Sequence, residues 1–256
     1  MAHPQTATFS EGDLDYIMDS LATDTRERAT LARAVREDRD IREAVLADER
    51  VFRAVLDTEE AFVNVSGYLF FSVLLLRALR DLQDRGYTLE REGDLTMPVF
   101  DSADVCAFLQ PEQIRDYLVA VLAGFVKSEQ RMVVVRRPQG KPRAMRVNDL
   151  DLRSLIRYCR AIDEEHRFGL YRHIADLCLF ASGVFSSDRV WGYTAATWIE
   201  QGTLFYSLAA GHRQASYHEL GDTLSALSEN FLLAVKPLRL IADRYLGAMR
   251  DEVFGG

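Results

Sequence analysis

The stretch DEEHRFGLYRHIAD contains two acid and histidine pairs, each three residues apart: Asp163 with His166, and His173 with Asp176. Carboxylates and imidazoles bind transition metals and transfer protons, so this stretch is the first candidate for chemistry. If the stretch is one α-helix, His166 and His173 project within about 20° of each other, about 10.5 Å apart along the axis. Because two imidazoles so far apart cannot share an ion, a metal site needs ligands from other helices.

Helical bundles that hold two iron ions combine two Glu-x-x-His motifs with two further glutamates. The best additional ligands in this chain are Glu200 and Glu229, which lie in otherwise apolar helices, although Thr203 and Leu232 stand where each motif requires histidine. The candidate metal ligands are therefore His166, His173, Asp176, Glu200 and Glu229. The pattern gives only part of the motif. No cofactor is expected, and a di-metal site is left open.

A structural interpretation of the same stretch is favoured. His173 and Asp176 have the spacing of a hydrogen-bonded pair on one helix face, which would orient the helix against its neighbours. Arg172 is expected to pair with a buried acid such as Glu200, because an unpaired charge in a helical core is costly.

Positive charge gathers in one segment of an otherwise acidic chain. Residues 1–130 contain 14 basic and 25 acidic side chains, whereas residues 131–147 contain six basic and no acidic ones. With two arginines at helical spacing just beyond, the candidate anion-binding set is Arg131, Arg136, Arg137, Lys141, Arg143, Arg146, Arg153 and Arg157. Clustered guanidinium groups bind phosphates. The favoured alternative is an exposed hairpin whose arginines prevent its edges from pairing with other chains.

The elements that must position these groups are mostly helices. Six prolines and fifteen glycines are few for 256 residues, and apolar residues recur three and four apart, which predicts a multi-helix bundle. Acceptor residues such as Asp24 and Asp57 mark helix starts, Gly86 marks a helix end, and Pro111 lies in a first helical turn. Loop is expected over residues 87–102, and one β-hairpin near 131–147.

Two further helices are predicted near the C-terminus. One runs through residues 190–211, where the aromatic residues Trp191, Tyr193, Trp198, Phe205 and Tyr206 are expected to be core. A long last helix carries a heptad seam from Leu220 to Ala248, with a kink at Pro237.

The chain is expected to be one helical domain spanning 1–256, with helical halves at 10–130 and 148–254 joined by the hairpin as the alternative. The apolar stretch Ala61–Leu79 is broken by Ser66, Gly67 and Ser72, so it is too short for a membrane span. Three separated cysteines favour a reduced, cytoplasmic protein.

The sequence favours a non-enzymatic helical interaction or scaffold protein, with a protein partner or self-association through the heptad seam. The equally favoured alternative for the seam is packing inside the monomer. The first alternative is an anion- or nucleic-acid-binding protein that acts through the basic hairpin. The second is a helical bundle that binds a metal or cofactor.

Overall fold

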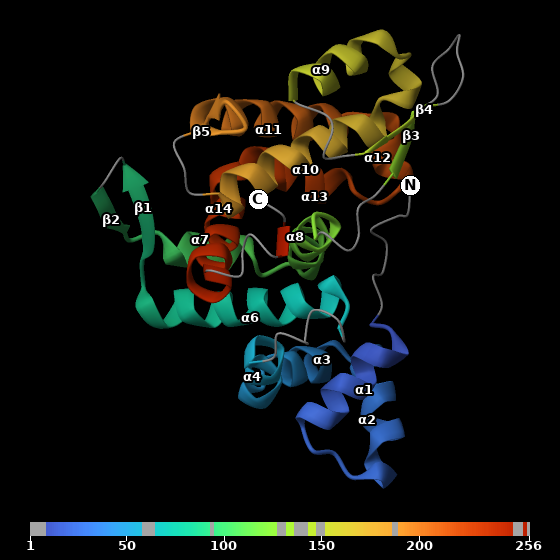
Figure 1. The fold of residues 1–256 in the computed structure, drawn as a ribbon, viewed down its shortest axis with the longest axis vertical. Coiled ribbons are helices and arrows are strands. Elements are labelled where there is room, and N and C mark those ends of the chain that lie inside the picture. Colours follow the sequence, from blue (N-terminus) through green and yellow to red (C-terminus); the bar gives the residue numbers. More distant parts are fainter. Residues whose placement is uncertain are drawn as a thin grey trace.

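The computed structural model describes residues 9–57, 65–92, 95–126, 132–135, 143–146, 152–185, 189–247 and 253–254. These residues form a mainly helical fold with short two-stranded antiparallel ribbons (Figure 1). The predicted fold class, a multi-helix bundle with a hairpin near residues 131–147, is confirmed.

Four short helices form one end of the molecule, at the bottom of Figure 1: α1 (Glu11–Ser20), α2 (Thr25–Glu37), α3 (Arg39–Leu46) and α4 (Glu49–Asp57). Asp24 caps α2 as predicted, because its carboxylate accepts the backbone N–H of Arg26 at 2.9 Å. Asp57 is the last residue of α4, and residues 58–64, where the next helix was expected, lie outside the described residues.

The central layer contains α6 (Gly67–Arg85), α7 (Ser102–Phe108) and α8 (Glu112–Gly124). The Ser66 hydroxyl caps α6 by accepting the N–H of Leu69, and Gly86 ends the helix with φ +75°. Pro111 directly precedes α8, close to its predicted place. The apolar residues of α6 pack inside the protein, and none of the helices in the described ranges is long and apolar enough to cross a membrane.

The remaining layer begins with α9 (Leu152–Ala161), the 3-10 turn η3 (Glu164–His166) and α10 (Phe168–Val184). It continues with α11 (Ala195–Ala210), α12 (Arg213–Tyr217), α13 (Gly221–Glu229), α14 (Phe231–Leu240) and the π-helical turn η4 (Ile241–Leu246). Helix α10 packs against both α11 and α14, and α11 packs against α13. In Figure 1, α9 lies at the end of the molecule opposite α1 and α2.

Three ribbons interrupt the helices of the described chain. The predicted hairpin pairs β3 (Met132–Val135) with β4 (Arg143–Arg146). The sequence did not predict the pairing of β1 (Thr88–Glu92) with β2 (Leu95–Val99), where loop was expected. It also missed β5 (Arg189–Val190) and β6 (Tyr193–Thr194), where a helix was expected.

The predicted C-terminal helix is divided. Asn230, with φ −122° and ψ 36°, separates α13 from α14, while Pro237 lies inside α14 and the π-helical turn follows at Ile241. Helices α11 and α14 approach each other closely beside this break, since a Cβ on Gly202 of α11 would lie 2.2 Å from the ring of Phe231 on α14. The seam residues Leu224, Leu227, Phe231, Ala234, Leu238 and Ile241 are buried, so the seam packs within the chain itself.

Candidate functional site

The predicted metal ligands do not converge. His166 lies in η3, before α10 begins at Phe168, so the expected single helix carrying both histidines does not form. Glu200 and Glu229 are exposed on α11 and α13, and the expectation that Glu200 is a buried partner of Arg172 was wrong. Within the described ranges, no group of three or more His, Cys, Asp and Glu could hold a metal ion.

Asp176 instead joins neighbouring helices through hydrogen bonds to two tyrosines. Its carboxylate accepts hydrogen bonds from the hydroxyls of Tyr117 on α8, at 2.7 Å, and Tyr206 on α11, at 2.9 Å. The Nε of Arg172 lies 3.4 Å from the Tyr117 hydroxyl. Burial, reinforced by the Asp176 carboxylate, raises the pKa of Tyr206, so this tyrosine remains a hydrogen-bond donor. His173 stacks beside Phe125, with ring centroids 6.4 Å apart.

Only part of the predicted anion-binding set can be placed. Arg131, Arg136, Arg137 and Lys141 lie outside the described residues. Arg143 and Arg146 lie on β4, of which the structure describes the backbone. Arg153 and Arg157 are exposed on α9.

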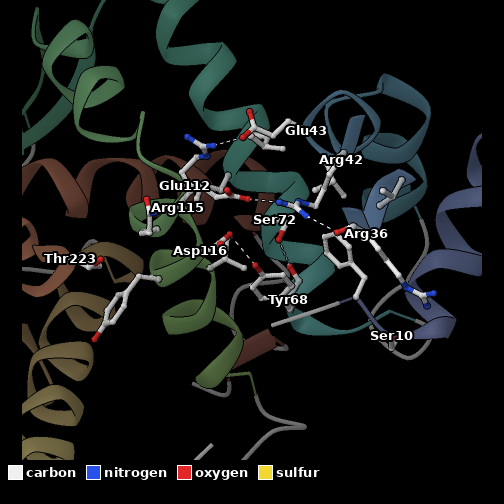
Figure 2. A pocket seen from close by; sticks show the side chains of 18 of the residues that line it. Ser10, Arg36, Arg42, Glu43, Tyr68, Ser72, Glu112, Arg115, Asp116 and Thr223 are labelled. Carbon is white, nitrogen blue, oxygen red and sulfur yellow. Dashed lines mark hydrogen bonds and ion pairs between the residues drawn. The ribbon is translucent and has the colours of Figure 1, made fainter. Parts of the chain in front are cut away.

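A cavity of about 820 Å³ lies between the N-terminal helices and the rest of the molecule (Figure 2). Its walls come from α1, α2, α3, α6, α8, α13 and the segment after α12. The apolar part of the wall consists of Phe9, Val35, Leu46, Leu75, Leu76, Val119 and Leu220. Cavities of this size, with a largely apolar wall and a few polar groups, are typical of small-molecule sites.

Two ion pairs connect α3 with α8 across the cavity, as Figure 2 shows. Arg42 binds Glu112 at 2.5 Å, and Arg115 binds Glu43. Arg115 is buried, and its guanidinium also donates to the carbonyl oxygens of Leu109 and Gln110, at 2.7 and 2.6 Å. These contacts hold the N-terminal helices against α8.

Neighbouring arginines lower the pKa of the Glu43 carboxyl. Burial alone would raise its pKa, but hydrogen bonds and attraction from Arg39 and Arg115 outweigh burial and hold the pKa below the ordinary value. Glu43 is therefore an ionised, firmly paired carboxylate at neutral pH, and its role is to fix the two helices.

Asp116 differs from the other carboxylates of the wall. The hydroxyl of Tyr68 donates to its Oδ1 at 3.0 Å (Figure 2), and this is its only hydrogen bond or ion pair among the contacts between described residues. Asp116 is solvent-exposed, yet the concave surroundings desolvate its carboxyl and raise its pKa. The Tyr68 hydrogen bond and the Arg42 charge oppose that rise, while Glu112 adds to it. Asp116 is thus an accessible carboxyl with a raised affinity for a proton.

Sequence reasoning missed this cavity. A signal was present in α8, where Glu112 and Asp116 lie one turn apart at the start of a helix whose second half is apolar. Arg42 and Glu43 gave no comparable signal, because charged residues on a short amphipathic helix usually face solvent. Only the folded chain, in which ion pairs join α3 to α8, shows that all four residues line one space.

No family model matches the chain, and neither a curated protein nor a solved structure is significantly similar to it. The arginines of the cavity wall form ion pairs with carboxylates. Asp116 and Tyr68 present a carboxyl and a hydroxyl to the cavity.

Proposed function

We propose that this chain is a non-enzymatic helical binding protein, and that the cavity between α3 and α8 holds a small molecule with an apolar body and at least one polar group. The observation that carries this proposal is the position of Asp116 and Tyr68 on the wall of a cavity of about 820 Å³. Glu112, one turn earlier on the same wall, is paired with Arg42. Asp116 lacks such an ion pair in the described part of the chain, so its carboxyl is available to a ligand.

Binding is favoured over catalysis because both serine hydroxyls of the wall are bonded to the backbone. Ser10 Oγ accepts the N–H of Asp13 and thereby caps α1. Ser72 Oγ donates to the carbonyl oxygen of Tyr68 at 2.7 Å. A nucleophilic serine needs a base positioned to take its proton, whereas both of these hydroxyls are engaged in backbone contacts.

The location of the cavity links ligand binding to the interaction role that the sequence favoured. The cavity is bounded on one side by α1 to α3 and on the other by α6 and α8. A ligand that touches both sides stabilises their contact, and it can bias any surface that these helices present to a partner protein.

The test compares two tryptophan substitutions on α6. Leu76→Trp places a large ring at the cavity wall, while Leu79→Trp places the same ring at another half-buried position of α6 that does not line the cavity. Protein purified gently from its own cells is denatured, and released small molecules are identified by mass spectrometry. We expect a compound in near-stoichiometric amount from wild type and Leu79→Trp, and its loss from Leu76→Trp.

Two results would contradict this proposal. One is the release of the same compound in the same amount from both variants. The other is a wild-type protein that releases nothing above background. Melting temperatures of both variants, measured beside these samples, show whether Leu76→Trp remains folded to the same extent as Leu79→Trp.

A further inference from the structure

The exposed face of α9 carries a row of arginines. Arg153, Arg157 and Arg160 are exposed and lie four and three residues apart, so they project from one side of the helix over about 10 Å. The apolar side of α9, with Leu152 and Leu155, is buried against the body of the protein. Ion pairs between described residues involve none of these three arginines. We call Arg153, Arg157 and Arg160 the arginine row.

Trp191, in the turn between β5 and β6, adopts an unusual conformation. It occupies the first position of the two-residue turn between β5 and β6 with φ +48°, which is strained for a bulky side chain, and its side chain is 56% exposed. Its ring contacts the edges of Phe185 and Trp198, with centroids 5.3 and 5.9 Å away. An exposed, strained aromatic residue is a functional candidate, because strain persists where the surroundings enforce it.

Tyr193 connects the two features. The backbone N–H of Arg153 donates to the Tyr193 hydroxyl at 3.3 Å, and the Tyr193 ring lies 5.2 Å from that of Trp198, which also touches Trp191. The first residue of the arginine row and the exposed indole therefore adjoin the same small aromatic group.

The charge of the molecule is unevenly distributed along its long axis. The acidic helices α1 to α4 lie at one end of the molecule, and α9 lies at the other (Figure 1). Exposed acids also follow the arginine row at residues 163–165, but Glu164 and Glu165 are paired with Arg167 and Arg213. An anionic partner is consequently repelled from the N-terminal end and attracted to the arginine row.

We propose that the arginine row and Trp191 form a binding surface for single-stranded nucleic acid. Successive arginines about one helical turn apart contact neighbouring phosphates, since guanidinium groups bind phosphate oxygens through paired hydrogen bonds. The indole of Trp191 offers a face on which an unpaired base stacks. A membrane surface is disfavoured because the apolar side of α9 is already buried, and a duplex because its bases are stacked on one another.

The test is fluorescence anisotropy of a labelled oligothymidylate of about 20 nucleotides, longer than typical single-strand sites of about 4–16 nucleotides. We expect the logarithm of affinity to fall with the logarithm of salt with a slope of about −2, from about −0.7 for each of three phosphate contacts. Replacing all three residues of the arginine row by Glu is expected to weaken binding by at least about tenfold.

Two matched variants separate the surface from general effects. Replacing Arg26, Arg33 and Arg85 by Glu makes the same charge change at exposed positions elsewhere and should leave most of the affinity. Trp191→Asn removes the ring but suits a turn position with positive φ, so the ribbon is retained. The Trp191→Asn variant should bind the oligonucleotide more weakly. The oligonucleotide should also no longer quench its tryptophan fluorescence, because the remaining tryptophan, Trp198, is buried.

Three outcomes would overturn this inference. The oligonucleotide does not bind at low salt, or both triple variants lose affinity equally, or the protein binds vesicles of phosphatidylserine and phosphatidylcholine but not the oligonucleotide. The cavity is not involved in any of these measurements, so their failure leaves the proposed ligand site unaffected.

Discussion

The hydroxyl of Tyr117 donates to the carboxylate of Asp176 across 2.7 Å, and this bond connects the wall of the cavity to the centre of the helical core. Tyr206 donates to the same carboxylate from the other side, at 2.9 Å. Because both tyrosines are buried, their hydroxyls depend on Asp176 as an acceptor. Asp176, which the sequence marked as a possible metal ligand, joins α8, α10 and α11.

Asp176→Ala is therefore expected to destabilise the protein by about 2–4 kcal/mol, because it leaves two buried hydroxyls without their acceptor. Asp176→Asn keeps an acceptor oxygen and should cost about half as much. Urea unfolding followed by circular dichroism measures both. Equal losses from the two variants, or a loss below about 0.5 kcal/mol for Ala, would show that the tyrosines find other partners.

Gly202→Ala tests the close approach of α11 and α14. In an exposed helix this change stabilises by up to about 1 kcal/mol, but here the new Cβ would lie 2.2 Å from the Phe231 ring and 3.0 Å from the Cβ of Cys178. We expect a net loss of about 1–3 kcal/mol in the free energy of unfolding. Gly12→Ala is the control, since its Cβ would meet only Ser10 Oγ at 3.7 Å, and it should be neutral or stabilising.

Asp101 should stabilise the protein in a pH-dependent way. Burial opposes its ionisation, but the Lys236 ammonium and the Thr88 hydroxyl outweigh burial and hold the pKa of Asp101 below its ordinary value. The stabilisation is therefore present above the unfolded-state pKa of about 3.9 and is lost as the pH falls through the lower folded-state pKa. Asp101→Asn should cost about 1–3 kcal/mol at pH near 7 and progressively less below about 4. Chemical unfolding across this pH range checks it, and a constant difference would refute it.

Asp116 should show the opposite dependence. Its raised pKa means that the protonated form is favoured in the folded state, a contribution that is complete below about 3.9 and is lost as the pH rises through the folded-state pKa. The charged groups facing it are Arg42, Glu112 and Arg115, with the Tyr68 hydroxyl. Asp116→Asn should thus raise the melting temperature at neutral pH and have little effect near pH 3.

The control for that measurement is Asp15→Asn on the exposed side of α1, which removes one carboxylate elsewhere and should change the melting temperature little at either pH. If Asp116→Asn lowers the melting temperature at neutral pH, the carboxylate serves the fold instead of a ligand. A rise in stability accompanied by loss of the bound compound is the expected trade between stability and function.

The helical class of the fold was predictable because it depends on local signals. Apolar spacing, the Asp24 cap and the terminal Gly86 act within one or two turns, and the structure confirms each of them. The β5–β6 ribbon was missed because Trp191 adopts a positive φ that its residue type disfavours, although Gly192 beside it, at φ +84°, was a turn signal. The sequence predicted a kink at Pro237, because proline is the strongest local signal in this segment. The helix is instead divided at Asn230, and Pro237 lies inside α14.

The candidate cavity was not predictable by the same means. Its ionisable residues come from α3 and α8, and nothing in either helix alone indicates that they meet. The predicted metal set failed for a related reason. His166 and His173 would be aligned only on one continuous helix, and the chain changes from a 3-10 turn to an α-helix between them.

The most direct test of the proposed ligand site is an electron-density map of crystals grown from protein purified gently from its own cells. We expect a compact organic molecule between α3 and α8, with a polar atom within hydrogen-bond distance of Asp116 or Tyr68. A map in which ordered water alone occupies this space, or in which the apolar side chains have closed it, would contradict the account.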